Sequence, residues 1–180
     1  MTVVIRESKE TQIRLTITAG SGVATVSTGD VFLDHMLVAF ARYAGVDLEV
    51  NATGDMRHHL IEDVAIALGQ AVAAFAPAGC ARYGERTVPM DDALVQVVLD
   101  IGGRPYYEGK LPSNLYEHFL RSFADNAKAT LHVRVIRGFD KHHIVEAAIK
   151  GLGFALREAL VETGAVFSTK GSVRLDITDS

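Results

Sequence analysis

The sequence motif HHxxE occurs twice in the chain, at residues 58–62 and 142–146. If both stretches are helical, the first His and the Glu of each motif lie one turn apart on the same face. Adjacent residues on a helix diverge by about 100°, so the second His points elsewhere. Each motif would then offer a His/Glu pair to one metal ion and a lone His to another. The six candidate ligands are His58, His59, Glu62, His142, His143 and Glu146.

Imidazole and carboxylate ligands together suit borderline divalent ions, and the carboxylates favour Mn or Fe over a structural Zn site. The motif is neither HExxH nor HxxEH, so no zinc protease is indicated. The alternative is that His pairs at helix starts are caps or solvated surface residues. Two such motifs in the same register, in a chain with only seven His, argue against that alternative.

Three further histidines lie outside the two motifs. His35, in DVFLDHML, has apolar neighbours that suggest a buried setting, with either a core or a ligand role. His132, in TLHVRV, lies on the strand predicted before the second motif and is the other candidate ligand. His118, in LYEHFLRSF, is expected to be structural or exposed.

Hydrophobic patterns predict the elements that would position these residues. Gly20–Gly22 is predicted to turn the first strand into a hairpin with the second. Asp30 is the predicted N-cap of the first helix, and Gly45 is its predicted terminator. Two of four predicted helices begin at the HHxxE motifs. The predicted strands are Thr11–Thr18, Val23–Ser27, Val46–Ala52, Ala93–Ile101, Pro105–Lys110 and Thr130–Ile136, and the predicted helices are Asp30–Ala44, Arg57–Ala76, Leu115–Asn126 and Lys141–Thr163.

The two HHxxE helices resemble each other beyond the motif. HHLIEDVAIALGQAV at 58–72 and HHIVEAAIKGLGFAL at 142–156 align at an offset of 84 and share His, His, Glu, Leu, Gly and Ala. We therefore predict an α+β fold in a single domain, residues 1–180, made of an internal repeat of about 1–90 and 91–180. The strongly apolar helix pairs are expected inside, with the sheets outside them.

Length, charge and composition exclude several classes of protein. A chain of 180 residues can bury a core without disulfides. The net charge of -4 argues against binding nucleic acid by phosphate neutralisation. The single Cys80 can form neither an internal disulfide nor a thiolate metal site. Residues 64–81 are uncharged, but Gln70 and Pro77 argue against a membrane span. Without a secretory signal, a cytoplasmic protein is expected.

Several shorter stretches complete the pattern. Besides the two HHxxE helices they are KET (Lys9–Thr11), FLDHML (Phe32–Leu37), RYG (Arg82–Gly84), PMDDAL (Pro89–Leu94), GRPY (Gly103–Tyr106), LHV (Leu131–Val133) and STKG (Ser168–Gly171). On these stretches the chain resembles imidazoleglycerol-phosphate dehydratases of histidine biosynthesis. The resemblance implies four helices between two four-stranded mixed β-sheets. It also implies a homo-oligomer of 24 subunits, with two Mn(II) ions per active site at subunit interfaces.

The resemblance further implies the roles of individual residues. One ion would be held by His35, His59, His142 and Glu146, and the other by His58, Glu62, His132 and His143. The implied reaction is loss of water from imidazole glycerol phosphate, a phosphorylated imidazole, to give imidazole acetol phosphate. Glu10 matches the family's candidate acid/base residue. The substrate phosphate would be bound by Arg82, Arg104, Ser168, Thr169 and Lys170.

The chain departs from the family pattern without losing a predicted ligand. The loop before His58 is about three residues shorter than in many relatives, and Leu60, Tyr43 and Asp140 stand where Thr, His and Asn are common. Two other functions remain open on the residues alone. A dinuclear metallohydrolase of a phosphorylated small molecule would need room for a bridging hydroxide in a crowded site. A non-catalytic metal-binding shell protein would leave Glu10 and the Arg/Ser/Lys set without a purpose.

Overall fold

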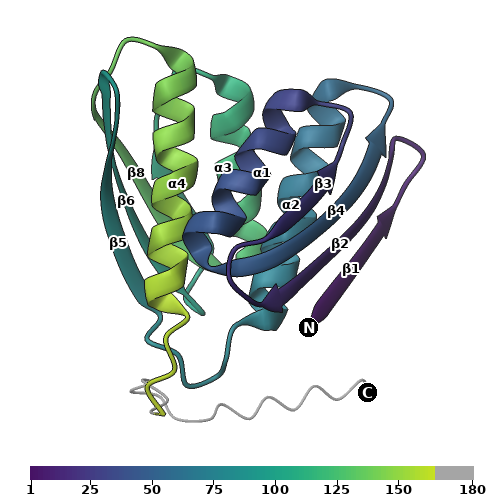
Figure 1. Cartoon of the computed structure of the whole chain (residues 1–180), viewed down its shortest axis with the longest axis horizontal. Helices are drawn as coiled ribbons and strands as arrows, with labels where there is room; N and C mark the ends of the chain where they lie inside the picture. Colours follow the sequence, from purple (N-terminus) through teal and green to yellow (C-terminus); the bar gives the residue numbers. More distant parts are fainter. Residues whose placement is uncertain (165–180) are drawn as a thin grey trace, which may run out of the picture.

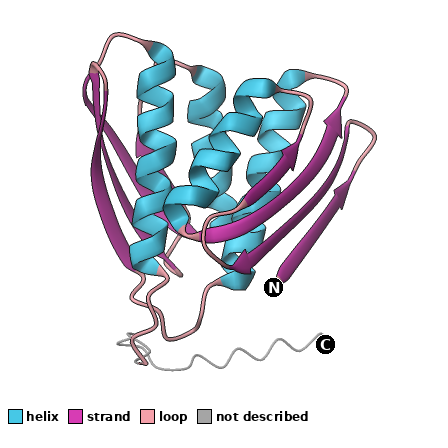
Figure 2. Cartoon of the chain, in the orientation of Figure 1, coloured by secondary structure: helices cyan, strands magenta, loops and turns pink. Residues whose placement is uncertain are grey.

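Four helices lie between two four-stranded sheets in the computed structural model, which describes residues 1–164 (Figures 1 and 2). This confirms the predicted α+β architecture. Each half supplies three strands, a helix, a strand and a helix, in that order. The first half contains β1 (Thr2–Glu7), β2 (Thr11–Ala19), β3 (Ala24–Ser27), α1 (Val31–Ala44), β4 (Val46–Gly54) and α2 (Arg57–Phe75). The second half contains β5 (Tyr83–Met90), β6 (Ala93–Ile101), β7 (Tyr106–Gly109), α3 (Asn114–Ala127), β8 (Ala129–Arg137) and α4 (Lys141–Ala159).

The two sheets have the same mixed topology. The first has the order β1-β2-β4-β3 and the second β5-β6-β8-β7. In each, the short last strand is parallel to its neighbour and the other pairs are antiparallel. Alternating buried residues along β2 and β6 turn one face of each sheet toward the helices.

The hairpin predicted at Gly20–Gly22 is wrong, because β3 pairs with β4 and not with β2. The reason lies in Asp47 at the start of β4. Its Oδ1 accepts hydrogen bonds of 2.9 to 3.1 Å from the backbone N–H groups of Ser21, Gly22 and Val23. This contact anchors the turn at the start of β4, and β3 then pairs with the edge of β4 opposite β2. Alternation of apolar residues predicts a strand but does not identify its neighbour.

Two strands and the end of one helix also differ from the predictions. The hydrophobic pattern did not predict β1 and β5, which form one edge of each sheet; no residue of β1 is fully buried. Helix α4 ends at Ala159 and not at Thr163. Beyond Ala159 the chain pairs with the segment that follows α2, since Thr163 N–H donates to the carbonyl oxygen of Gly79 at 2.9 Å.

The helices pair across the two halves, with α1 against α4 and α2 against α3. A glycine allows each close approach. A Cβ on Gly69 would come within 2.6 Å of the Phe123 carbonyl oxygen, and a Cβ on Gly153 within 2.9 Å of that of Phe40. The two glycines are equivalent in the repeat, because 153 − 69 = 84. This packing brings helix starts from different halves together.

The long uncharged stretch predicted not to be a membrane span lies mostly in α2, where ten residues are buried. Helix α2 contacts both α3 and β2, so apolar side chains on several of its sides are covered by protein. Within residues 1–164, no helix is both long and apolar enough to cross a membrane.

Candidate metal centre

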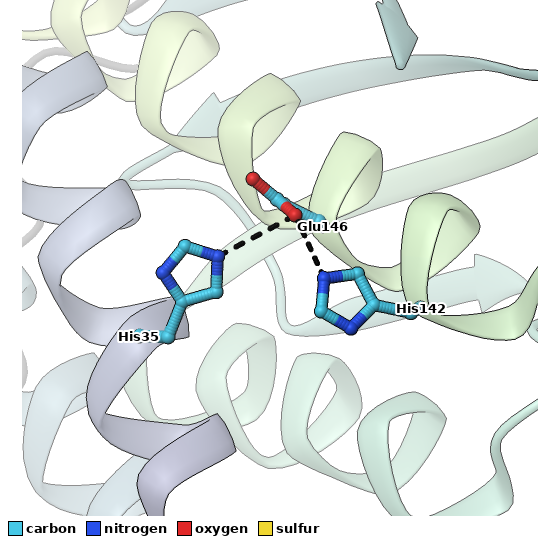
Figure 3. A group of neighbouring side chains, drawn as sticks. All are labelled: His35, His142 and Glu146. Carbon is cyan, nitrogen blue, oxygen red and sulfur yellow. Dashed lines mark hydrogen bonds and ion pairs between the residues drawn. The ribbon is translucent and has the colours of Figure 1, made fainter. Parts of the chain in front are cut away.

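Three predicted ligands from both halves meet near the starts of two helices. His35 comes from α1, and His142 and Glu146 come from α4 (Figure 3). The Nε2 atoms of His35 and His142 lie 3.4 and 3.1 Å from the same carboxylate oxygen, Oε2 of Glu146. We call these three residues the Glu146 group. Their ligand atoms all lie within 4.8 Å of one another, as the donors to one ion must.

Local contacts position the Glu146 group. Asp140 caps α4 and accepts a hydrogen bond of 2.7 Å from the backbone N–H of His142. Lys150, one turn further along α4, donates to the other carboxylate oxygen, Oε1, at 2.8 Å. Glu146 itself is only 5% exposed. Burial acts to raise the pKa of its carboxyl group, but the interactions with Lys150 and His35 outweigh burial and lower that pKa.

The buried setting predicted for His35 is wrong. Its side chain is 49% exposed. Leu33, Met36 and Leu37 form the buried face of α1, and His35 lies off that face, toward α4. Its ring is therefore open to an incoming ligand.

A second group of the same composition forms between α2 and α3. Nε2 of His58 lies 3.4 Å from Oε2 of Glu62, and Nε2 of His118 lies 3.4 Å from Oε1 of Glu62. The two His rings are 5.2 Å apart. We call these residues the Glu62 group. His118, which was expected to be structural or exposed, is thus a candidate ligand that the sequence reasoning missed.

The internal repeat explains the position of His118. It is the fifth residue of α3, as His35 is the fifth residue of α1, and 118 − 35 = 83. The signal was present in the sequence: DHMLVAFARYA at 34–44 and EHFLRSFADNA at 117–127 share His, Leu, Phe and two Ala. Extending the repeat from the HHxxE helices to the two shorter helices would have found it.

The second His of each motif faces acidic residues of its own half. Nδ1 of His59 lies 2.8 Å from Asp55 and 3.8 Å from Glu10. Nδ1 of His143 lies 2.6 Å from Asp92. Hydrogen bonds that the two imidazoles donate to the carboxylates of Asp55 and Asp92 raise the pKa of His59 and His143. A carboxylate at Nδ1 orients the ring and leaves Nε2 as the natural ligand atom, but neither ring joins a group formed by residues 1–164 of its own chain.

His132 lies on the outer face of the second sheet. Its neighbours on β8, Leu131 and Val133, are buried, and His132 is exposed between them. Its ring lies 5.7 Å from that of Tyr106. Within one chain the sheet therefore separates His132 from Glu62. The structure instead places His118 beside Glu62, in the position that the resemblance gave to His132.

The other predicted site residues are spread over the chain. Glu10 is exposed in the loop between β1 and β2, beside His59. Arg82 follows α2, whose 19 residues place its two ends about 27 Å apart. Arg82 pairs with Asp100 at 3.0 Å, and Arg104 is exposed before β7. Arg82 is thus far from the metal groups of the same chain. The Arg104 carbonyl oxygen accepts a hydrogen bond from Thr130, just beyond the end of α3 that is remote from His118. Ser168, Thr169 and Lys170 lie outside the described residues.

A family model described as imidazoleglycerol-phosphate dehydratase matches residues 28–156. The chain belongs to the imidazoleglycerol-phosphate dehydratase family. The members of this family are hydro-lyases, so the chain is an enzyme. The matched region contains both the Glu146 group and the Glu62 group.

Relatives match nearly the whole chain. The imidazoleglycerol-phosphate dehydratase of Methanosarcina mazei is 45% identical over 185 residues, which cover 93% of this chain and 96% of that protein. That of Pyrococcus furiosus is 44% identical over 175 residues, covering 92% and 98%. The crystal structure of the Pyrococcus furiosus enzyme in complex with (S)-C348 has a TM-score of 0.86 at 42% identity, covering 94% of this chain and 100% of that one. The Staphylococcus aureus enzyme has a TM-score of 0.79 at 34% identity, covering 90% and 100%.

The donor chemistry of both groups fits a divalent metal ion. Each group offers two imidazole nitrogens and one carboxylate, a set suited to Mn, Fe and related ions. Three donors do not fill the coordination sphere of an octahedral ion, so positions remain for further protein ligands or for substrate. The two groups could therefore hold two ions of an imidazoleglycerol-phosphate dehydratase.

Proposed function

We propose that the chain catalyses the metal-dependent dehydration of imidazole glycerol phosphate to imidazole acetol phosphate in histidine biosynthesis. The observation that carries this proposal is the pair of His/Glu/His groups, each built from both halves of the chain. A family relationship over most of the chain supplies the substrate class.

The Glu146 group would hold one ion and the Glu62 group the other, with His118 in place of His132. Mn(II) is the expected ion, because nitrogen and carboxylate ligands are mixed in both groups. When bound, the ions would supply Lewis-acid activation and templating at the nitrogens of the substrate's imidazole ring.

A residue of the chain would accept the proton that the reaction removes from carbon. In this dehydration the hydroxyl group leaves the carbon next to the ring, and a proton leaves the neighbouring carbon, giving an enol that becomes the ketone. Glu10 has a 57% exposed side chain beside His59, so its carboxylate is available as the base for that proton. Arg82 and Arg104 would bind the phosphate group.

The complete site would combine residues of several copies of the chain. His59 and His143 lie outside the two groups that the described residues of their own chain form. Arg82 follows the far end of α2. Exposed apolar side chains, including Met56 and Phe139, lie next to the His motifs, which suits an interface between copies. A homo-oligomer follows from this proposal, with 24 subunits by family resemblance.

A direct assay tests the proposal. Protein loaded with Mn(II) and given imidazole glycerol phosphate is expected to form the ketone without releasing inorganic phosphate. Chelator treatment should abolish turnover, and added Mn(II) should restore it. Phosphate release would instead favour the dinuclear metallohydrolase, and a folded, metal-loaded protein without turnover would favour the metal-binding shell protein.

A further inference from the structure

The Glu62 and Glu146 groups have the same donors but different surroundings. Lys150 donates to Oε1 of Glu146 at 2.8 Å, which leaves Oε2 facing the two His rings of that group. The equivalent position in the first half is Ile66, because 150 − 84 = 66. Glu62 therefore has no lysine one turn along its helix, and its two oxygens face His58 and His118.

Lys150 is held close to the Glu146 group. Its side chain is only 16% exposed. The ammonium group also lies 3.4 Å from the sulfur of Met90 and 5.6 Å from the ring centre of Tyr43. These contacts come from β5 and α1, so the charge is enclosed by three elements. A buried carboxylate such as Glu146 needs a counter-charge, and Lys150 supplies it without a metal ion.

The acidic residues beside the second His of each motif do not distinguish the two groups in the way that Lys150 does. His59 has two acidic neighbours, Glu10 and Asp55. His143 also has two, Asp91 at 3.4 Å and Asp92 at 2.6 Å. If His59 and His143 each serve as a further ligand to one of the two ions, both bring two neighbouring carboxylates with them.

Two arginines line the hollow beside His58 and His118, but each has its own carboxylate partner. Arg57 pairs with Asp30 at 2.5 Å, and Arg121 pairs with Glu117 at 3.9 Å. Neither arginine forms an ion pair with Glu62 among those of the described residues. In the part of the chain that the structure describes, Lys150 is thus the charge that distinguishes the two groups.

We propose that the two metal positions are unequal, with the Glu62 group binding its ion tightly and filling first, and Lys150 weakening the ion at the Glu146 group. This inference rests on the proposed two-metal function. The physical reason is direct: a fixed positive charge one carboxylate away repels the ion and occupies an oxygen that would otherwise bind it. The Glu146 position would then be the one that exchanges metal as its concentration changes.

Titration of the chelator-treated, full-length protein with Mn(II) tests this, with free Mn(II) counted by its paramagnetic resonance signal. Two classes of site are expected, one ion of each per chain, and at least about tenfold apart in affinity. Glu62→Gln should remove the tight class, and Glu146→Gln the weak one. Two sites of equal affinity, or a tighter site that depends on Glu146, would overturn the inference while leaving the proposed function intact. Failure of the folded wild type to bind Mn(II) would overturn both.

A swap between the equivalent positions gives the sharpest variants. Lys150→Ile should raise the Mn(II) affinity of the weak class toward that of the tight class. Ile66→Lys should lower the Mn(II) affinity of the tight class. Lys150→Arg keeps the charge and should keep the gap between classes. If Lys150→Ile fails to fold, Lys150→Gln serves the same purpose, and circular dichroism checks each variant. An unchanged gap in a folded Lys150→Ile or Lys150→Gln protein would contradict the role given to Lys150.

Discussion

His35 and His118 occupy the same position in the two halves of the chain, each the fifth residue of its helix and each 3.4 Å from the glutamate of an HHxxE motif. In both cases the glutamate belongs to the other half of the chain. The pairing of α1 with α4 and of α2 with α3 brings each His beside that glutamate. Each half therefore donates one His to the motif of its partner half. Neither half alone could form either group, so both groups depend on the packing of the two halves.

Replacing His118 separates the two ligand assignments for the second ion. His118→Ala removes a donor 3.4 Å from Glu62, so we expect the loss of one metal ion per chain and a fall in activity of more than about 100-fold. His132→Ala is the matched control, because His132 lies on the outer face of the second sheet. Metal content and turnover should be close to wild type in that control. The reverse result would restore His132 as the ligand.

Gly69 and Gly153 are expected to be intolerant of a side chain. Alanine is the better helix former, but a Cβ at either position would lie 2.6 to 2.9 Å from a carbonyl oxygen of the facing helix. The helices would have to separate, so Gly69→Ala and Gly153→Ala should each lower the free energy of unfolding by about 1–3 kcal/mol. Chemical denaturation measures this. Gln70→Ala, at an exposed neighbour on α2, should change stability little.

The sequence predicted the parts of the site that depend on local geometry. Helical spacing places His142 one turn from Glu146, and the observed distance between Nε2 and Oε2 is 3.1 Å. The same geometry predicted that His143 diverges from His142, and the two side chains have different partners, Glu146 for His142 and Asp92 for His143. The N-cap at Asp30 and the terminator at Gly45 are also confirmed, since both depend only on neighbouring residues.

The parts that the sequence did not predict depend on contacts between distant segments. Nothing in its own helix marks His118 as a ligand; its equivalence to His35 in the repeat and its contact with Glu62 on another helix do. The partner of β3 was misassigned because the contact of Asp47 with the preceding turn is not encoded in hydrophobic alternation. His132 could not be assigned to a face of its sheet until the register of β8 was known.

Asp47 should make stability depend on pH. Hydrogen bonds from the backbone N–H groups of Val23 and Ser21 are the main causes that lower the pKa of this carboxyl group below 3.8 in the folded chain. A lowered folded-state pKa means that the stabilisation is present above pH 3.8 and is lost as the pH falls through the folded-state value. Asp47→Asn should therefore lower the unfolding midpoint at neutral pH, with the difference shrinking in acid. Glu49→Gln, an exposed carboxylate on the same strand, is the control and should show a smaller change.

Mixed assemblies test whether His143 completes the Glu62 group of another copy. His143→Ala and Glu62→Gln should each be inactive alone, since each removes a donor to the same ion. Co-expressed, a His143→Ala chain still supplies an intact Glu62 group, and a Glu62→Gln chain still supplies His143. If the site is shared, random assembly should restore at most about a quarter of the sites.

The control for this experiment uses two variants within one group. His58 and Glu62 lie 3.4 Å apart on the same helix, so no combination of His58→Ala with Glu62→Gln chains can rebuild an intact Glu62 group. That mixture should stay inactive although it assembles in the same way. Activity in the first mixture and none in the second requires His143 and Glu62 to act from different chains. Inactivity of both mixtures, in assemblies of wild-type size that contain both variants, would mean that His143 serves its own chain and would require the loop between β8 and α4 to rearrange when metal binds.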